Sequence, residues 1–210
     1  TKLVHVSTSE TYGSAQYTPI DELHPLVGQS PYSASKISAD KMAESYYLSF
    51  GLPVVTARPF NTYGPRQTAR AVIPTIASQL IAGRRSLKLG SLTPTRDFNF
   101  VTDTARGMLA LALSNNNDGE VINIGSGEEW SIQRTVDLLV GISGNEIEIL
   151  TDEDRMRPEK SEVNRLVADN SKIMRCTDWK SEVAFHDGLQ MTYEWIGKNI
   201  HLFDIDKYAK

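Results

Sequence analysis

The sequence predicts an α/β fold built around a parallel sheet, and three observations support this prediction. Residues 3–7 (LVHVS) and 53–57 (PVVTA) are short apolar runs of the kind that form buried strands in parallel sheets. Residues 32–50, between them, carry Ala, Met, Lys and Glu at helical spacing, with Gly51 as a stop signal. The order strand, helix, strand indicates a βαβ unit.

The later elements are predicted from the same signals. Loops rich in Gly, Pro or Ser are expected at about 13–31 and 58–70. Helices are expected at 73–82, from Thr102 or Asp103 as N-cap to about 113, and at 131–140 after Ser131 as N-cap. Strands are expected at 86–89, 96–100, 121–124 and 147–150. The last third is predicted to be polar loop and then helix, with Trp179 and Trp195 packed.

The composition excludes several classes of protein. The 210 residues are 40% hydrophobic and 23% charged, which is ordinary for a globular protein and unlike a disordered chain or a disulfide scaffold. With 22 basic and 26 acidic residues, no basic field favours nucleic acid or an anionic membrane as a partner. No apolar run approaches the roughly 20 residues of a membrane span. The single cysteine, Cys176, fits a reducing cytoplasm, which is the expected location.

One candidate motif is the pair Tyr32 and Lys36. The two residues are four apart, so both side chains lie on one helical face and could serve one site. An ammonium group lowers the pKa of a neighbouring phenol in general, which lets such a tyrosine act as a base. A chance pair on the surface is the alternative.

The other candidate motif, residues 7–13 (STSETYG), directly follows the first predicted strand. Ligands of open α/β sheets bind at the carboxyl ends of strands, so Thr8, Ser9 and Glu10 are placed for catalysis. A strand-ending turn is the alternative, because Ser, Thr and Gly favour turns. Glu10 is less expected in such a turn.

Together these residues resemble the extended short-chain dehydrogenase/reductase family, in its branch of NDP-sugar 4,6-dehydratases and epimerases. The resemblance covers the whole chain and rests on six segments: STSETYG, PYSASK, ARPFNTYGPRQ, TRDFNFVTDTARG, VINIGSG, and RPEKSEV with its following AD. It implies a partial Rossmann fold, a parallel doubly wound sheet lacking its N-terminal half, with a smaller α/β substrate-binding domain. Residues 1–60 and 101–126 would belong to the NAD-binding domain, and 61–100 and 127–210 to the substrate domain.

The resemblance also implies catalytic roles. Thr8, Tyr32 and Lys36 match the family's catalytic Thr/Ser, Tyr and Lys. Tyr32 would take the proton of the sugar C4 hydroxyl while hydride leaves C4 for NAD, and Thr8 would hydrogen-bond the same oxygen. Lys36 would bind the nicotinamide ribose, and Pro59 would also lie at the cofactor.

Glu10 separates subclasses of this branch. The 4,6-dehydratases carry a carboxylate here to remove the C5 proton once C4 is a ketone, whereas 4-epimerases usually carry a small or apolar residue. Ser9 resembles the Thr-Ser-Glu version found in GDP-mannose dehydratases, and we expect Glu10 to act as both base and acid. A 4,6-dehydratase is therefore expected. Nucleotide-sugar decarboxylases also carry Thr-Ser-Glu, so decarboxylase and epimerase remain alternatives.

Substrate binding is assigned to polar residues further along the chain. Asn61, Arg96 and Arg157 match family positions that contact the nucleotide diphosphate, and Arg66 lies in a loop that lines the substrate cleft. Guanidinium groups suit phosphate oxygens, although each arginine alone could form a surface salt bridge. The four histidines lack metal-ligand spacing, so no metal site is expected. The segment 125–127 (GSG) is expected to be structural.

A glycine-rich first βα turn, which dinucleotide-binding folds use, does not occur in this sequence. We therefore expect the chain to be the C-terminal portion of an enzyme that binds NAD poorly by itself; an inactive fragment is the alternative. The segment KNIHLFDIDKY resembles enzymes acting on nucleotide-linked N-acetylglucosamine in legionaminic acid pathways. The family also implies a homodimer through the helix that carries Tyr32.

Overall fold

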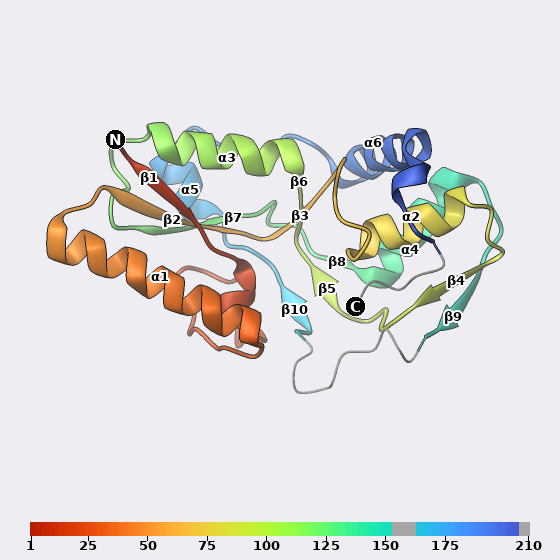
Figure 1. The fold of residues 1–210 in the computed structure, drawn as a ribbon, viewed down its shortest axis with the longest axis horizontal. Helices are drawn as coiled ribbons and strands as arrows, with labels where there is room; N and C mark the ends of the chain where they lie inside the picture. Colours follow the sequence, from red (N-terminus) through yellow and green to blue (C-terminus); the bar gives the residue numbers. More distant parts are fainter. Residues whose placement is uncertain (153–162, 206–210) are drawn as a thin grey trace. The chain divides into compact units, whose positions relative to one another are not determined.

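The computed structural model describes residues 1–152 and 163–205, which form two compact units. The first unit comprises the described parts of Thr1–Thr62, Thr95–Glu129 and Pro158–Glu182, and the second comprises those of Tyr63–Pro94, Trp130–Arg157 and Val183–Lys210. Both units contain parallel strand pairs together with helices (Figure 1). The predicted α/β class is confirmed.

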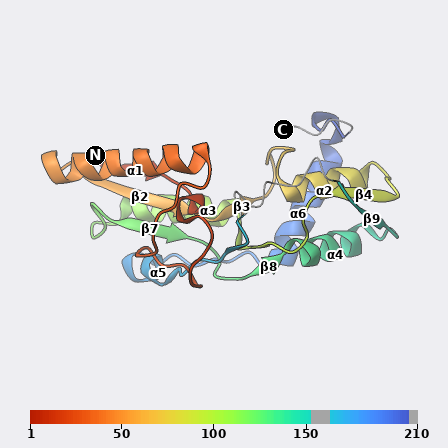
Figure 2. The same ribbon diagram turned by 90° about the horizontal axis from the view of Figure 1, so that it is seen from below.

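A three-stranded parallel sheet forms the centre of the first unit. Its order is β1 (Leu3–Val6), β2 (Val54–Pro59) and β7 (Val121–Ile124). Helix α1 (Pro31–Phe50) lies on one face, and α3 (Val101–Leu113) and α5 (Ser171–Cys176) lie on the other (Figure 2). The order β1, α1, β2 confirms the predicted βαβ unit.

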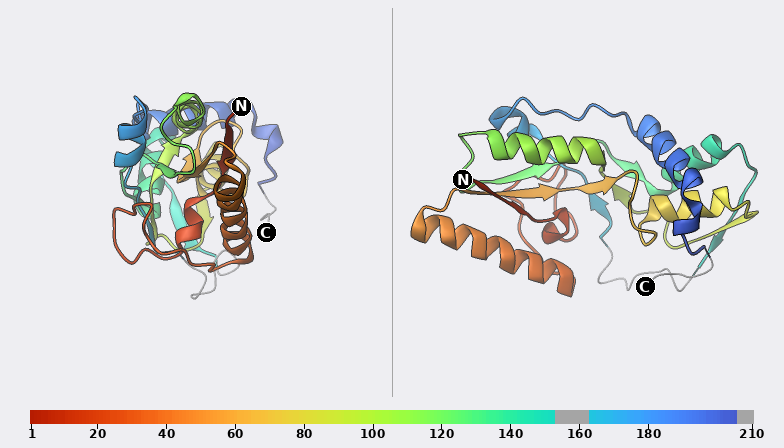
Figure 3. Two further views of the ribbon diagram at one scale, coloured as in Figure 1. Left: turned by 90° about the vertical axis from the view of Figure 1, so that its left-hand side faces the viewer. Right: turned by 45° about the horizontal axis from the view of Figure 1, so that its top comes forward.

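The face of this sheet toward α1 is polar, because side chains alternate between the two faces along each strand. The register places His5 beside Thr56, and Arg58 beside Asn123 two residues further along. Ser7 continues this row directly after β1, where its N–H donates to the carbonyl of Ala57. Figure 3 shows α1, in orange, running along this face.

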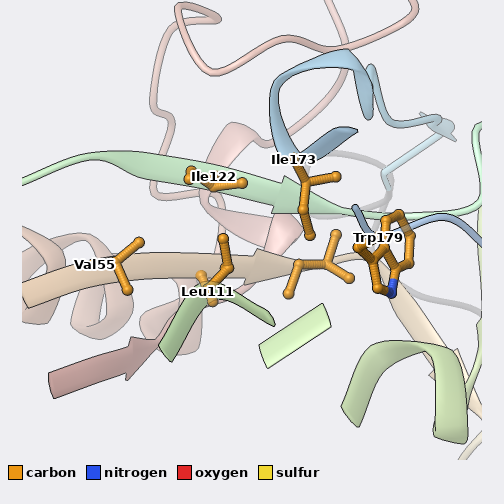
Figure 4. Packing of buried hydrophobic residues seen from close by; sticks show 7 residues of the cluster. Val55, Leu111, Ile122, Ile173 and Trp179 are labelled. Atoms are coloured by element: carbon orange, nitrogen blue, oxygen red, sulfur yellow. The ribbon is translucent and has the colours of Figure 1, made fainter. Parts of the chain in front are cut away.

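The opposite face of the sheet is apolar. Residues of β2 and β7, among them Val55 and Ile122, pack against Leu111 of α3, Ile173 of α5 and Trp179 (Figure 4). These side chains are at most 5% exposed. The predicted packing of Trp179 is confirmed, and this cluster is the hydrophobic core of the unit.

Shorter elements complete the first unit. The 3₁₀ helix η1 (Ser9–Tyr12) follows β1. Strand β3 (Asn61–Tyr63) pairs with β6 (Phe98–Phe100), and β5 (Thr95–Arg96) pairs in parallel with β10 (Arg165–Leu166).

The second unit combines helices with a parallel pair of strands. Strands β4 (Ser86–Leu89) and β9 (Glu148–Thr151) pair in parallel, and β8 (Trp130–Ser131) leads into α4. The helices α2 (Val72–Ile81), α4 (Ile132–Ser143) and α6 (Phe185–Lys198) pack against one another, and the 3₁₀ helix η4 (Ile200–Leu202) follows α6. Buried residues such as Ile76, Leu139 and Leu189 form the core of this unit.

The structure also corrects several predictions. The expected strand 96–100 is divided at Asp97, because the segment changes its pairing partner there: β5 pairs with β10, whereas β6 pairs with β3. Helix α3 begins after Phe100, so neither Thr102 nor Asp103 is its N-cap. Residues 163–182 pack in the first unit, through β10 and α5, although the sequence places them in the second domain. Strand β1 is half exposed rather than buried.

Asp97 holds together three distant segments of the first unit. Its fully buried carboxylate accepts hydrogen bonds from the N–H groups of Ser126 (2.8 Å), Gly127 (2.9 Å) and Ala168 (3.1 Å), and from the hydroxyl of Ser126 (2.7 Å). Burial raises the pKa of Asp97, and these donors act in the opposite direction. The N–H groups and the hydroxyl of the turn at 125–127 therefore bind the buried carboxylate of Asp97.

Gly125→Ala is expected to destabilise the protein by about 2 kcal/mol, as overpacking of a filled site does. An added Cβ would lie 2.5 Å from Cβ of Ala168 and 2.7 Å from Oδ2 of Asp97. Urea denaturation measures the change. The matched control is Gly141→Ala within α4, where a Cβ meets no atom within 4 Å and the helix should gain about 0.5–1 kcal/mol. Equal stability of the two variants would contradict the packing at Gly125.

Candidate active site

The 3₁₀ helix η1 places three candidate residues at the carboxyl end of β1. Thr8 is its N-cap, and the Thr8 hydroxyl accepts a hydrogen bond from the N–H of Glu10 at 3.2 Å. Ser9 is buried, whereas Glu10 is partly exposed. The hydroxyl of Thr11 donates to the Thr8 carbonyl at 2.8 Å and tightens the turn. The sequence TSET thus ends the strand and directs it into a short, internally bonded turn.

The first turns of α1 carry Tyr32 and Lys36. The helix is well defined at this end, because Ser30 and Ser33 form a reciprocal capping box and Pro31 occupies the first helical position. The ammonium group of Lys36 donates to the carbonyl of Val6, the last residue of β1, at 2.9 Å. Tyr32 is 51% exposed. The structure therefore brings the start of α1 to the end of β1, two residues before Thr8.

A buried carboxylate that the sequence analysis missed lies further along the same helix. Asp40 accepts hydrogen bonds from Ser7 Oγ at 2.9 Å and from Nη2 and Nε of Arg58 at 2.9 and 3.2 Å. Nε2 of His5 lies 3.0 Å from the other carboxylate oxygen. Asp40 and Arg58 are 4% and 3% exposed, so this ion pair is shielded from water. Two features of the sequence could have indicated this cluster. Arg58 follows a mostly apolar strand segment, and His5 and Ser7 alternate with valines in and after the first strand.

Tyr12, the last residue of η1, extends this polar cluster. The guanidinium of Arg58 lies 4.9 Å from the ring centre of Tyr12, and the Tyr12 hydroxyl donates to Asn123 Oδ1 at 2.7 Å. Burial raises the pKa of Tyr12 to about 12 despite the neighbouring Arg58, so this phenol stays protonated and is not a base. For Arg58, burial lowers the pKa, but Tyr12 and Asp40 outweigh it and the net direction is upward.

Glu22 fixes the loop between η1 and α1 to the sheet. Its carboxylate accepts a hydrogen bond from the N–H of Asn123 at 2.8 Å, and the Asn123 amide donates to the Ile20 carbonyl at 3.0 Å. Burial raises the pKa of Glu22 above 4.5, although the Asn123 N–H lowers it. Folding therefore makes the charged form of this side chain less favourable than it is in the unfolded chain.

Glu22→Gln is expected to stabilise the protein at neutral pH. Because the folded pKa is raised, the stabilising contribution of Glu22 is complete at low pH and is lost as the pH rises through that pKa. Glutamine stays neutral and can still accept the Asn123 hydrogen bond. The difference in melting temperature between variant and parent should be close to zero near about pH 4 and positive near about pH 8. The exposed control Glu146→Gln should show no such trend.

The predicted substrate-binding residues are only partly brought together. In the first unit, the N–H of Asn61 donates to the Asp97 carbonyl at 3.0 Å, which places Asn61 beside the strand that carries Arg96. The Asn61 side-chain oxygen is buried without a hydrogen-bond partner in the described parts of the chain, so a ligand could satisfy it. Pro59 ends β2, where it lies beside Ile124 of β7 and two residues beyond Ala57, the partner of Val6 at the end of β1. Arg66 belongs to the second unit, is exposed and has a φ of 70°. Arg157 lies outside the described residues.

Residues 1–152 and 163–205 contain neither a metal-binding cluster nor a membrane-spanning helix. No group of three or more His, Cys, Asp and Glu side chains there could hold a metal ion. No helix in these ranges is long and apolar enough to cross a membrane.

Comparison with known proteins assigns the chain to a family. The sequence model described as GDP-mannose 4,6 dehydratase matches residues 1–192. The chain belongs to the GDP-mannose 4,6-dehydratase family. This assignment confirms the resemblance to extended short-chain dehydrogenases/reductases of the NDP-sugar dehydratase and epimerase branch.

Relatives of this GDP-mannose 4,6-dehydratase family member include both dehydratases and epimerases. A dTDP-glucose 4,6-dehydratase from Actinoplanes sp. is 36% identical over 201 residues, covering 94% of this chain and 61% of that protein. The crystal structure of dTDP-glucose 4,6-dehydratase from Bacillus anthracis in complex with NAD has a TM-score of 0.84 at 34% identity, covering 95% of this chain and 63% of the other. UDP-glucuronic acid 4-epimerase from Bacillus cereus, with UDP-glucuronic acid and NAD, has a TM-score of 0.87 at 31% identity, covering 94% and 62%. The chain thus spans about three fifths of the length of these relatives.

Proposed function

We propose that the protein containing this chain is an NAD-dependent NDP-sugar 4,6-dehydratase that forms a 4-keto-6-deoxy sugar nucleotide. The observation that carries this proposal is Glu10, a partly exposed carboxylate in the turn after β1, beside the end of α1 that bears Tyr32 and Lys36. A dehydratase needs such a carboxylate, because after oxidation at C4 it must remove the C5 proton. The dehydratases among the relatives support the same reaction.

The residues of the chain divide the proton transfers between them. Tyr32, as the general base, accepts the proton of the C4 hydroxyl, and the Thr8 hydroxyl donates a hydrogen bond to the same oxygen. The C4 ketone acidifies the C5 hydrogen, and Glu10 removes it as a proton. Glu10 then returns this proton to the departing C6 hydroxyl, so that water is lost across C5 and C6. Ser9 is buried in the same turn, directly before Glu10.

The donor set of the first unit suits a dinucleotide. An ammonium group has three N–H donors, and Lys36 uses one of them on the Val6 carbonyl, which leaves donors for ribose hydroxyls. Lys36, Tyr32 and Pro59 would hold the nicotinamide half of NAD at the carboxyl ends of β1 and β2. NAD bound there would supply the hydride chemistry of the reaction, the removal of hydride from C4 and its return at C6.

Epimerisation at C4 is the second candidate, because a UDP-glucuronic acid 4-epimerase is among the similar structures. The two reactions begin with the same oxidation but differ in mass balance, since only the dehydratase releases water. The full-length protein should be incubated with UDP-, GDP- and dTDP-sugars and the products analysed by mass spectrometry. Loss of one water supports the dehydratase, an isomer of unchanged mass supports the epimerase, and loss of carbon dioxide from a uronate supports a decarboxylase.

Other parts of the proposal concern partners and location. Asn61, Arg96, Arg66 and Arg157 are proposed to bind the diphosphate and the sugar, with nucleotide-linked N-acetylglucosamine as the proposed substrate. A homodimer through α1 is supported by exposed apolar side chains on this helix, including Met42, Leu48 and Phe50. The cytoplasm is the proposed location.

A further inference from the structure

The contact between α1 and the sheet depends on polar groups. The two fully buried residues of this 20-residue helix are Ser33 and Asp40, while its apolar side chains are all at least partly exposed. Packing of apolar side chains therefore does little to fix the rotation of α1 about its axis. Hydrogen bonds depend on direction, so the bonds of Asp40 can fix this rotation.

Asp40 lies on the same face of α1 as the two proposed catalytic residues. Tyr32, Lys36 and Asp40 are spaced four residues apart, so they form one row along the helix. The Asp40 carboxylate binds Ser7, the residue immediately before Thr8, while Lys36 binds Val6. The row is thus attached to the end of β1 at two points directly beside the turn that carries Thr8 and Glu10.

Arg58 gives this attachment its rigidity. It donates two hydrogen bonds to the carboxylate oxygen that also accepts from Ser7, and it comes from β2, the neighbouring strand. His5 contacts the second oxygen from β1. Asp40 therefore connects the helix to two strands at once, in a site that water does not reach.

We infer that Asp40 is a positioning residue that sets Tyr32 and Lys36 against Thr8 and Glu10. This inference rests on the proposed function for those four residues. Asp40 itself touches neither substrate nor cofactor. It acts through Ser7 and through the orientation of α1.

The test is Asp40→Asn in the full-length protein, assayed well below the melting temperature. Asparagine keeps the shape of the side chain but presents an N–H₂ group to donors, so the network must rearrange. The expected result is a fall in kcat of about 10- to 100-fold, as small misplacements of catalytic groups produce, with KM for the nucleotide sugar within about 2-fold. Ser7→Ala, which keeps the Asp40–Arg58 pair, should lower kcat less and leave KM unchanged.

Asp103→Asn is the matched control. Asp103 is also a fully buried carboxylate, and it accepts hydrogen bonds from Arg106, Ser181 and the N–H of Glu182, on the opposite side of the sheet from α1. This variant should lose stability but keep the kcat of the folded protein. Parental kcat in folded Asp40→Asn, or an equal fall in kcat in Asp103→Asn, would overturn the inference.

A second readout does not depend on turnover. In amide NMR spectra of the 210-residue chain, Asp40→Asn should shift the signals of residues 8–12 and 32–36, and Asp103→Asn should leave them in place. If the parent protein turns over no nucleotide sugar, the proposed function fails, and these spectra still decide whether Asp40 positions the two segments. Unshifted signals at 32–36 in Asp40→Asn would refute the positioning role.

Discussion

Tyr32→Phe is expected to lower kcat of the full-length protein by about 10³-fold, because the substitution removes the group proposed to take the C4 hydroxyl proton. Phenylalanine keeps the ring but can neither accept nor donate a proton. Tyr32 is half exposed in the first turns of α1, so the fold should tolerate the change. The direct measurement is the absorbance of reduced nicotinamide after mixing enzyme, NAD and substrate, which should no longer appear.

The control for this variant is Tyr46→Phe, which removes a phenol from the same helix. Tyr46 is 48% exposed and its ring contacts Phe50. Its substitution should change kcat by less than about 2-fold, as is usual for a surface residue away from the reacting groups. Normal reduction of NAD by the Tyr32 variant would show that another group takes the proton.

Glu10→Gln is expected to separate oxidation from water loss. Glutamine cannot take the C5 proton, so formation of the 4-keto-6-deoxy product should fall by about 10²- to 10⁴-fold. Oxidation at C4 should continue, since Thr8, Tyr32 and Lys36 are unchanged. Mass spectrometry follows the loss of water, and nicotinamide absorbance follows the oxidation.

Glu44→Gln serves as control, because Glu44 is an exposed carboxylate that pairs with Lys41 on the outer surface of α1. It should leave both readouts unchanged. Formation of the 4-keto-6-deoxy product by Glu10→Gln at near the parental rate would rule out the role of Glu10 in water loss and show that another group removes the C5 proton.

The elements that the sequence predicts best are those whose signal is local. Strands β4 and β7 occupy the predicted 86–89 and 121–124, because a short segment in which leucine or β-branched residues recur at alternate positions, bounded by polar residues or glycine, specifies a strand. The predicted break at Gly51 is also correct, as this residue takes the left-handed conformation that ends α1. The division of a strand at Asp97 could not be predicted, because the strands that pair on either side of it, β10 and β3, come from distant parts of the sequence.

The candidate site shows the same division between local and distant causes. A strand followed by STSE is enough to predict that Thr8, Ser9 and Glu10 lie at the edge of a parallel sheet. Asp40 was not predicted, because its role depends on Ser7 and Arg58, which come from two different strands. Residues 3–7 and 53–57 were both predicted to be buried strands. This prediction overlooked the alternation of polar and apolar side chains along them, which makes one face of the sheet polar.

The hydrogen bonds of the Asp97 carboxylate affect where the chain can accept insertions and deletions. The chain leaves the first unit after Thr62 and after Glu129, and it returns to that unit at Thr95. Asp97 lies two residues after this return, and its partners Ser126 and Gly127 lie just before the second departure. A single carboxylate therefore joins two chain segments that each lie next to a crossing of this boundary. Insertions or deletions in the second unit would leave these bonds in place, so the second unit could diverge in sequence while the sheet of the first unit stayed the same.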